Sequence, residues 1–211
     1  MTLPMTPSKK IYLASKSPRR RELLHQVGIA FEIILLRDAP PRGPDVTEIV
    51  LPNEKAHDYV ARVTQEKAQA AWQAMLMRKL PAHPILAADT SVILDDHILG
   101  KPADMEQAMA MLGSLAGRSH TVLTSIALKT EHELLHCTQE SEVHFCAMSA
   151  DEIRAYCQTN EPYDKAGGYG IQGLAARYIS HINGSYSGIM GLPLFETCKL
   201  LQQAGLHHHT T

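Results

Sequence analysis

β-rich runs alternate with helical patterns along this chain, and the alternation constrains the fold more than any single motif does. The β-rich runs lie at 10–15, 31–36, 84–94, 120–128 and 176–182. Helical spacing or capping signals mark 18–27, 53–80, 104–115, 149–160 and 193–204; Asp104 with Gln107 and Ser149 with Glu152 have capping-box spacing. Strands that alternate with helices are typical of an α/β fold, so we predict one with a mixed sheet.

The first predicted helix begins with a cluster of cations. Ser17 and Pro18 supply an N-cap and a first-turn proline, and Gly28 ends the helix. Three arginines, at 19–21, then lie in the first turn, where the helix dipole is already positive. These cations repel one another and the helix dipole, and a bound phosphate would turn that repulsion into attraction. The alternative is a solvated basic turn without a ligand.

Composition argues against several partners and compartments. The formal net charge is −2 and aromatic residues make up 5% of the chain, which gives no basic, aromatic surface for nucleic acid. The apolar runs are too short to span a membrane, and "MTLPMTPSKK" does not resemble a secretory signal. The four cysteines lack CxxC spacing, which favours reduced thiols in the cytoplasm. We therefore expect a cytoplasmic protein with no membrane or nucleic-acid partner.

Two motif matches lack the structural context that their chemistry requires. "GGYGIQG", at 167–173, has GxGxxG spacing, but no strand precedes it and no helix follows, so we predict a flexible loop that exposes its backbone to a ligand. "HELLH", at 132–136, matches the HExxH zinc pattern, which needs a helix. It follows a polar turn between β-rich runs, so we predict a hairpin whose histidines face solvent.

The β-rich run at 84–94 has a polar break at Asp89 and Thr90, and the apolar residues before Asp89 are typical of a buried strand. An acid at the end of a core strand is often catalytic or a metal ligand, although a turn-forming Asp is an equal alternative at this stage. Lys101 lies shortly afterwards in "GKP" without Walker spacing, which excludes a P-loop.

Several ordered segments resemble the Maf family of nucleoside triphosphate pyrophosphatases. They are "LASKSPRRRELL", "YVARVTQEKA", "LAADTSVILDDHILGKP" and "EPYDKAGGYGIQG", with "INGSYSGIMGLP" near the end. The resemblance implies a Maf/ITPase-like, elongated, two-lobed fold that hydrolyses a nucleoside triphosphate to the monophosphate and pyrophosphate with Mg²⁺ or Mn²⁺, often as a homodimer. We expect a single catalytic domain over 10–205, a disordered extension at 1–9 and a C-terminal tail at 206–211.

The resemblance also implies site residues. The essential acid falls on Asp89, and the acidic pair of the family's "DVDE" motif falls on "DVTE" at 45–48, where Thr47 replaces the first acid and Glu48 keeps the second. Glu48 and Asp89 are therefore the expected metal ligands, and Asp89 is expected to act as base, metal ligand or both. The expected phosphate-binding and charge-stabilising residues are Ser15, Ser17, Arg20, Lys67, Lys101 and Lys165.

Three further positions separate branches of the family. Arg19, Thr90 and Gln172 match the set typical of the branch acting on dTTP and UTP, whereas the branch acting on 7-methylated GTP has an aromatic residue first and Glu third. The Gln amide both donates and accepts hydrogen bonds, which suits the edge of uracil or thymine. The alternatives are a modified pyrimidine triphosphate as substrate, and a non-enzymatic regulator of cell division.

Overall fold

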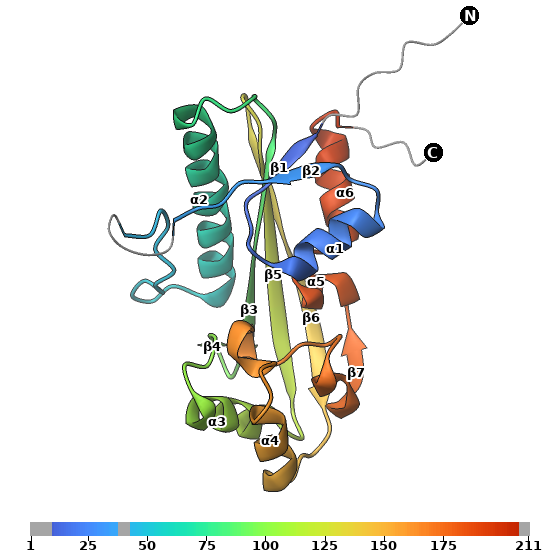
Figure 1. Ribbon diagram of the computed structural model, residues 1–211. Helices are drawn as coiled ribbons and strands as arrows, with labels where there is room; N and C mark the ends of the chain where they lie inside the picture. Colours follow the sequence, from blue (N-terminus) through green and yellow to red (C-terminus); the bar gives the residue numbers. More distant parts are fainter. Residues whose placement is uncertain (1–9, 38–42, 207–211) are drawn as a thin grey trace, which may run out of the picture.

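The computed structural model describes residues 10–37 and 43–206 (Figure 1). The strands are β1 (Ile11–Leu13), β2 (Phe31–Ile33), β3 (Ile85–Leu94), β4 (His97–Leu99), β5 (Ser119–Lys129), β6 (Leu134–Phe145) and β7 (Ile179–Asn183). The α-helices are α1 (Pro18–Gln26), α2 (Ala56–Met77), α3 (Met105–Leu115), α4 (Ala150–Cys157), α5 (Tyr186–Met190) and α6 (Leu194–Gln203). Three short 3₁₀ turns lie between α4 and β7: η1 (Pro162–Asp164), η2 (Ala166–Gly168) and η3 (Leu174–Tyr178).

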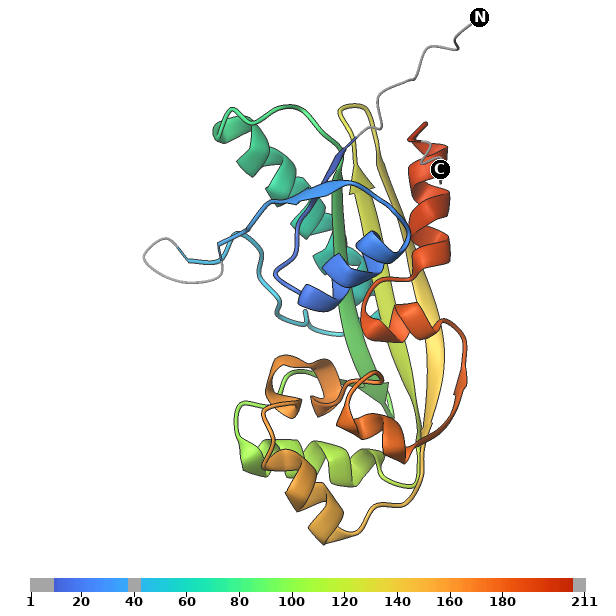
Figure 2. The ribbon, with the colours of Figure 1, turned by 45° about the vertical axis from the view of Figure 1, so that its right-hand side comes forward.

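All seven strands form one mixed sheet, as predicted. The strand order is β2-β1-β3-β5-β6-β7, and β4 also pairs with β3. The pairs β1–β2 and β1–β3 are parallel, and the remaining pairs are antiparallel. The long strands β3, β5 and β6 run from one end of the molecule to the other, which gives it an elongated, two-lobed shape (Figures 1 and 2).

Helices cover both faces of the upper half of the sheet. The even-numbered residues Leu86 and Ala88 of β3 pack in the core formed with α1 and α6. The odd-numbered Ile85 and Ala87 pack in the core under α2. Alternate side chains of a strand point to opposite faces, so a run such as "ILAA" must be apolar throughout when both faces are covered.

The lower lobe has its own core. It joins the second half of β3, the first half of β5 and the second half of β6 to α3, α4 and the segment after α4. Figure 2 shows α3, α4 and the 3₁₀ turns below α1. The two lobes therefore share continuous strands but have separate helical layers.

One edge of β3 is left without a neighbour between the lobes. Tyr12 and Leu13 of β1 pair with the start of β3, and β4 pairs with its end, from Val92 to Leu94. Among the described residues, no strand pairs with 88–91 on this side, although β5 pairs with β3 along the whole other edge, from Ile85 to Ile93. The edge groups of 88–91 are thus open to a ligand.

Several predicted boundaries differ from the structure. Asp89 and Thr90 do not interrupt or end a strand, because pairing with Ser125 and Thr124 of β5 carries β3 through them. The long helix begins at Ala56 and ends at Met77 rather than at 53 and 80, and Asn53 and Lys79 have positive φ. The second strand covers 31–33, not 31–36.

The predicted local signals are otherwise present. The capping box of Ser149 and Glu152 is formed, and Asp104 caps α3, although Gln107 accepts from Ala103 instead of completing the box. "HELLH" lies at a hairpin: His132 is in the turn, and β6 begins at Leu134. Both histidines of the motif are exposed, which confirms the hairpin prediction.

No helix in the described ranges is long and apolar enough to cross a membrane. The predicted disordered extension at 1–9 and most of the tail at 206–211 lie outside the described residues. The single domain over 10–205 stays a prediction.

Candidate active site

A cavity of about 970 Å³ lies between the lobes at the open edge of β3. Its walls come from the segment between β1 and α1, the loop at 46–49, the start of the lower lobe at 98–101 and the segment at 164–172. Every residue that the sequence predicted for the site lines it: Ser15, Ser17, Arg19, Arg20, Glu48, Lys67, Asp89, Thr90, Lys101, Lys165 and Gln172. Residues spread over more than half the chain therefore converge on one cleft.

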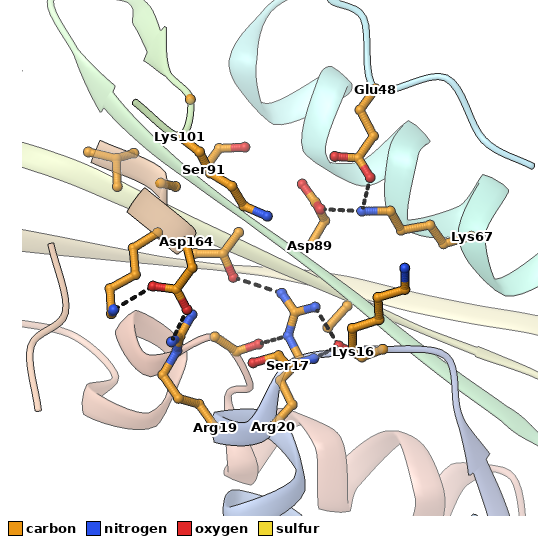
Figure 3. Close-up of a pocket in the computed structure, with 18 of the residues that line it drawn as sticks. Lys16, Ser17, Arg19, Arg20, Glu48, Lys67, Asp89, Ser91, Lys101 and Asp164 are labelled. Carbon is orange, nitrogen blue, oxygen red and sulfur yellow. Dashed lines mark hydrogen bonds and ion pairs between the residues drawn. The ribbon is translucent and has the colours of Figure 1, made fainter. Parts of the chain in front are cut away.

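Asp89 faces the helix α2. Its Oδ1 accepts a hydrogen bond from Lys67 Nζ at 2.6 Å, and Glu48 Oε1 lies 2.8 Å from the same ammonium (Figure 3). Asp89 and Lys67 are mostly buried, whereas the Glu48 side chain is 56% exposed on its loop. The ammonium thus holds two carboxylates together at the cleft.

Thr90, the next residue, faces α1 on the other side of the sheet. Its Oγ1 accepts a hydrogen bond from Arg20 and lies 3.0 Å from the hydroxyl of Thr124. The Thr124 hydroxyl donates to the carbonyl of Gly188, and because a hydroxyl has one hydrogen, Thr90 must be the donor to Thr124. The result is a directed chain from Arg20 through Thr90 and Thr124 to Gly188.

Arg20 is the central cation on the side of the cavity that α1 forms. Its guanidinium donates to Gly191 O at 2.7 Å, Ser15 Oγ at 3.2 Å and Thr90 Oγ1 at 3.2 Å (Figure 3). Burial lowers its pKa below the usual range, and nearby Asp89 partly offsets this, but an arginine stays charged. All three acceptors are neutral oxygens, so these contacts orient the charge without neutralising it.

An acid on the lower lobe holds two other cations. Asp164 Oδ2 accepts from Arg19 at 3.1 Å, and Oδ1 accepts from Lys165 at 2.5 Å (Figure 3). Burial alone would raise the pKa of Asp164, but the hydrogen bonds from Lys165 and Arg19 lower it below its ordinary value. Arg19 belongs to α1 and Asp164 to η1, so this ion pair joins the lobes across the cleft.

The glycine segment is not the flexible, exposed loop that the sequence predicted. Gly167 to Ile171 are buried, and a Cβ on Gly167 would lie 2.9 Å from Val92. Tyr169 fills this segment, and its hydroxyl pairs with His120 Nε2 at 2.7 Å. Gln172 is exposed at the cavity, and its amide has no hydrogen-bond partner among the described residues.

Sequence reasoning missed three contributors to the cleft. Lys16 and Ser91 line it, and the Gly191 carbonyl accepts from Arg20 (Figure 3). Lys16 stands between two predicted residues, so its position in "ASKSPRR" was an available signal. A backbone acceptor such as the Gly191 carbonyl leaves no side-chain signal.

The cleft is strongly cationic, and its acids are few. Seven lysines and arginines line it against three carboxylates, those of Glu48, Asp89 and Asp164. In residues 10–37 and 43–206, no group of three or more His, Cys, Asp or Glu side chains converges as a complete metal site. Glu48 and Asp89 could still hold a hard divalent cation, because Mg²⁺ is usually bound by one or two carboxylates together with substrate phosphates and water.

The fold and this cleft define an α/β protein with a strongly cationic cleft between two lobes. Residues 10–204 match the family described as "Maf-like protein", and the chain belongs to the Maf family. A relative from Bordetella avium named dTTP/UTP pyrophosphatase is 52% identical over 93% of this chain and 96% of that protein.

Two other proteins of that name match this chain with similar identity and coverage. The one from Nitrosomonas europaea is 49% identical over 93% of this chain and 95% of that protein. The one from Cupriavidus metallidurans is 52% identical over 93% of this chain and 98% of that protein. Among solved structures, the Staphylococcus aureus Ham1 protein matches with a TM-score of 0.43 and 16% identity, over 65% of this chain and 72% of that one.

Proposed function

We propose that this chain hydrolyses dTTP and UTP to the nucleoside monophosphate and pyrophosphate. The observation that carries the proposal is the Arg20 charge, which is held by neutral oxygens in a cleft that also contains Asp89. The name shared by relatives about half identical over nearly their whole length supports the same reaction.

The cations bind and orient the triphosphate. Arg20 and Lys101 offset its negative charge, and Lys165 contributes from the lower lobe. Water attacks the α-phosphorus, the bond from that phosphorus to the bridging oxygen breaks, and pyrophosphate takes the electron pair. A carboxylate placed at the attacking water accepts its proton, and Asp89 is the candidate.

A divalent cation fits the acidic side of the cleft. Glu48 and Asp89 each use one oxygen toward Lys67, which leaves a second carboxylate oxygen on each. These two residues would hold Mg²⁺ or Mn²⁺ with phosphate oxygens of the substrate. When bound, the cation neutralises phosphate charge and polarises the phosphorus. Lys67 Nζ contacts both carboxylates and so holds them close together.

Gln172 is our candidate for reading the base. Arg19, Thr90 and Gln172 are the three branch-specific positions, but Arg19 is paired with Asp164 and Thr90 with Arg20 and Thr124. The Gln172 amide is the unpartnered group of the three in the described structure. It can donate to a carbonyl and accept from the N–H of a uracil or thymine edge. Thr90 then acts through Arg20 rather than on the base.

A pyrophosphate-release assay over a nucleotide panel tests the proposal. The panel contains dTTP, UTP, CTP, GTP, 7-methyl-GTP and 5-methyl-UTP, each with Mg²⁺, with Mn²⁺ and with EDTA. We expect release to be fastest with dTTP or UTP and to require the metal. Hydrolysis of 7-methyl-GTP at least as fast as UTP would contradict the specificity. Faster hydrolysis of 5-methyl-UTP would favour a modified pyrimidine, and no hydrolysis at all would leave the non-enzymatic regulator.

We also propose that the chain acts in the cytoplasm as a homodimer with one catalytic domain per chain. The four cysteines are free thiols, which suits a reducing compartment. Light scattering of the purified protein measures the oligomeric state directly.

A further inference from the structure

The segment that carries Gln172 is anchored on both sides, and the anchors differ in kind. Gln172 is a central residue of a turn closed by the hydrogen bond from Gly173 N to Gly170 O, at 3.0 Å. On the N-terminal side, Ile171 is 7% exposed and packs in the lower core next to Tyr169. On the C-terminal side, Ala175 packs in the same core, and a single carboxylate accepts from the backbone N–H groups of Leu174 and Ala175.

That carboxylate belongs to Glu161. Its Oε2 accepts from Leu174 N at 2.8 Å, and its Oε1 accepts from Ala175 N at 3.4 Å and from the Tyr156 hydroxyl at 3.0 Å. Glu161 lies 13 residues before Leu174, so the contact folds the segment back on itself. A carboxylate that accepts from two successive backbone N–H groups and a hydroxyl fixes the backbone direction there.

The neighbouring residues fit around this carboxylate. A Cβ on Gly173 would lie 2.3 Å from Glu161 Oε1, so the turn approaches as closely as it does because residue 173 has no side chain. The Glu161 carbonyl accepts from Lys165 Nζ at 2.6 Å. One residue thus contacts the turn that carries Gln172 and a cation of the cleft.

We propose that Glu161 is a positioning residue that sets substrate discrimination by holding the turn at 170–173, and with it the Gln172 amide, at the cleft. Glu161 does not line the cavity, so it acts through the backbone rather than on the nucleotide. The inference rests on the proposed function for its effect on substrate choice. Its effect on the turn stands on the contacts of Glu161 alone.

Glu161→Gln is the direct test, because the amide keeps the size of the side chain but exchanges one acceptor for a donor that would face an N–H group or the Tyr156 hydroxyl. We expect the amides of Leu174 and Ala175 to exchange with solvent at least roughly tenfold faster. We expect the ratio of kcat/KM for UTP to that for GTP to fall roughly 5- to 20-fold. Tyr156→Phe removes the hydroxyl that donates to Glu161 and receives a backbone hydrogen bond from Gly170, but it leaves the carboxylate with Leu174 and Ala175, so it should shift both readouts in the same direction by less.

Glu152→Gln is the matched control. Glu152 is also a lower-lobe carboxylate that accepts from the backbone, at the start of α4, but it does not contact the turn. It should leave the UTP-to-GTP ratio and the exchange of Leu174 unchanged. A destabilised protein that is merely less folded would lose activity on both nucleotides in equal proportion.

The outcomes separate the two proposals. If the wild-type protein does not hydrolyse UTP, the proposed function is wrong, and amide exchange in Glu161→Gln still decides whether Glu161 holds the turn. If the wild-type protein hydrolyses UTP, and Glu161→Gln keeps both the ratio and the slow exchange, the positioning role is wrong and the proposed function stands. If Glu161→Gln does not fold, Glu161→Asp, which withdraws the carboxylate by one methylene from Leu174 N, decides the positioning role by the same two readouts.

Discussion

At the scale of single residues, two neighbours on β3 serve opposite sides of the sheet. Asp89 contacts Lys67 of α2, and Thr90 contacts Arg20 of α1. The side-chain alternation of a strand accounts for this division, because consecutive residues must point to opposite faces. One rigid strand therefore holds the acid on one side and, through Thr90, orients the buried cation of α1 on the other.

Asp89→Asn should lose about two or more orders of magnitude in kcat, the scale expected of a general base or a metal-organising acid. The side chain keeps its shape, and Lys67 keeps Glu48 as a partner, so the variant should stay folded. Pyrophosphate release and circular dichroism on the same sample measure both. Near-normal turnover in a folded variant would remove Asp89 from the mechanism.

Gln172→Glu should reduce kcat/KM for UTP and dTTP by roughly 5- to 150-fold, equivalent to about 1–3 kcal/mol. The carboxylate only accepts hydrogen bonds, so it would face a base carbonyl without a hydrogen to offer. GTP hydrolysis should fall less or rise, because guanine offers donors, and inhibition by pyrophosphate should barely change. Equal losses on UTP and GTP would mean that Gln172 supports the turn and does not read the base.

At the scale of elements, the loop that carries Glu48 is held by side chains of α2: Tyr59 and Lys67 contact Glu48 itself, and Arg62 holds the residues that follow it. Arg62 donates to the Ile49 carbonyl at 2.9 Å and to both oxygens of Glu54, at 2.6 and 2.9 Å. The bonds from Arg62 lower the pKa of Glu54 to about 2, so this ion pair persists across the working pH range. The loop has no regular secondary structure at 46–50, so side-chain contacts must fix it.

Arg62→Gln should therefore raise the Mn²⁺ concentration needed for half-maximal activity, while kcat at saturating metal changes little. The reason is that Glu48 would have to be ordered at the moment of metal binding. Arg78→Gln is the control, because Arg78 also donates to a loop carbonyl, that of Leu35, but away from Glu48. An unchanged metal requirement in Arg62→Gln would show that the loop is ordered by other contacts.

At the scale of the whole molecule, a buried histidine links the lower core to acid stability. His120 is 4% exposed and packs against Phe145 and Tyr169. Burial, with a smaller effect of His144, lowers its pKa from 6.5 to about 4. As the pH falls below about 6.5, His120 binds a proton in the unfolded chain but stays neutral in the folded chain. The free energy of unfolding is therefore highest above this pH and decreases as the pH falls toward about 4.

His120→Gln should remove most of that loss, which is on the order of 3 kcal/mol for a shift of this size. Urea unfolding of wild type and variant at pH 7.5, 6, 5 and 4.5 measures the difference in slope with pH. His132→Gln, at the exposed hairpin turn, should keep the wild-type slope. If the free energy of unfolding falls as steeply in His120→Gln as in the wild type, other groups dominate acid unfolding.

The sequence by itself determined the α/β class, the mixed sheet and the hairpin at "HELLH". Local spacing and capping carry this information, because strand and helix periods and N-cap chemistry act over a few residues. The residues of the candidate site were predicted instead from the segments that resemble the Maf family. The functional roles of the site residues stay predictions, but their convergence in one cleft agrees with the order of the segments that resemble the Maf family.

Only the tertiary structure decided how Asp89, Thr90 and the glycine segment are placed. Pairing with β5 carries β3 through two polar residues that looked like an end, and packing around Tyr169 buries glycines that looked exposed. The absence of a strand beside 88–91 depends on where β1 stops and β4 begins. These features come from contacts between segments far apart in the chain, whose free energy outweighs local preference and leaves no mark in local sequence.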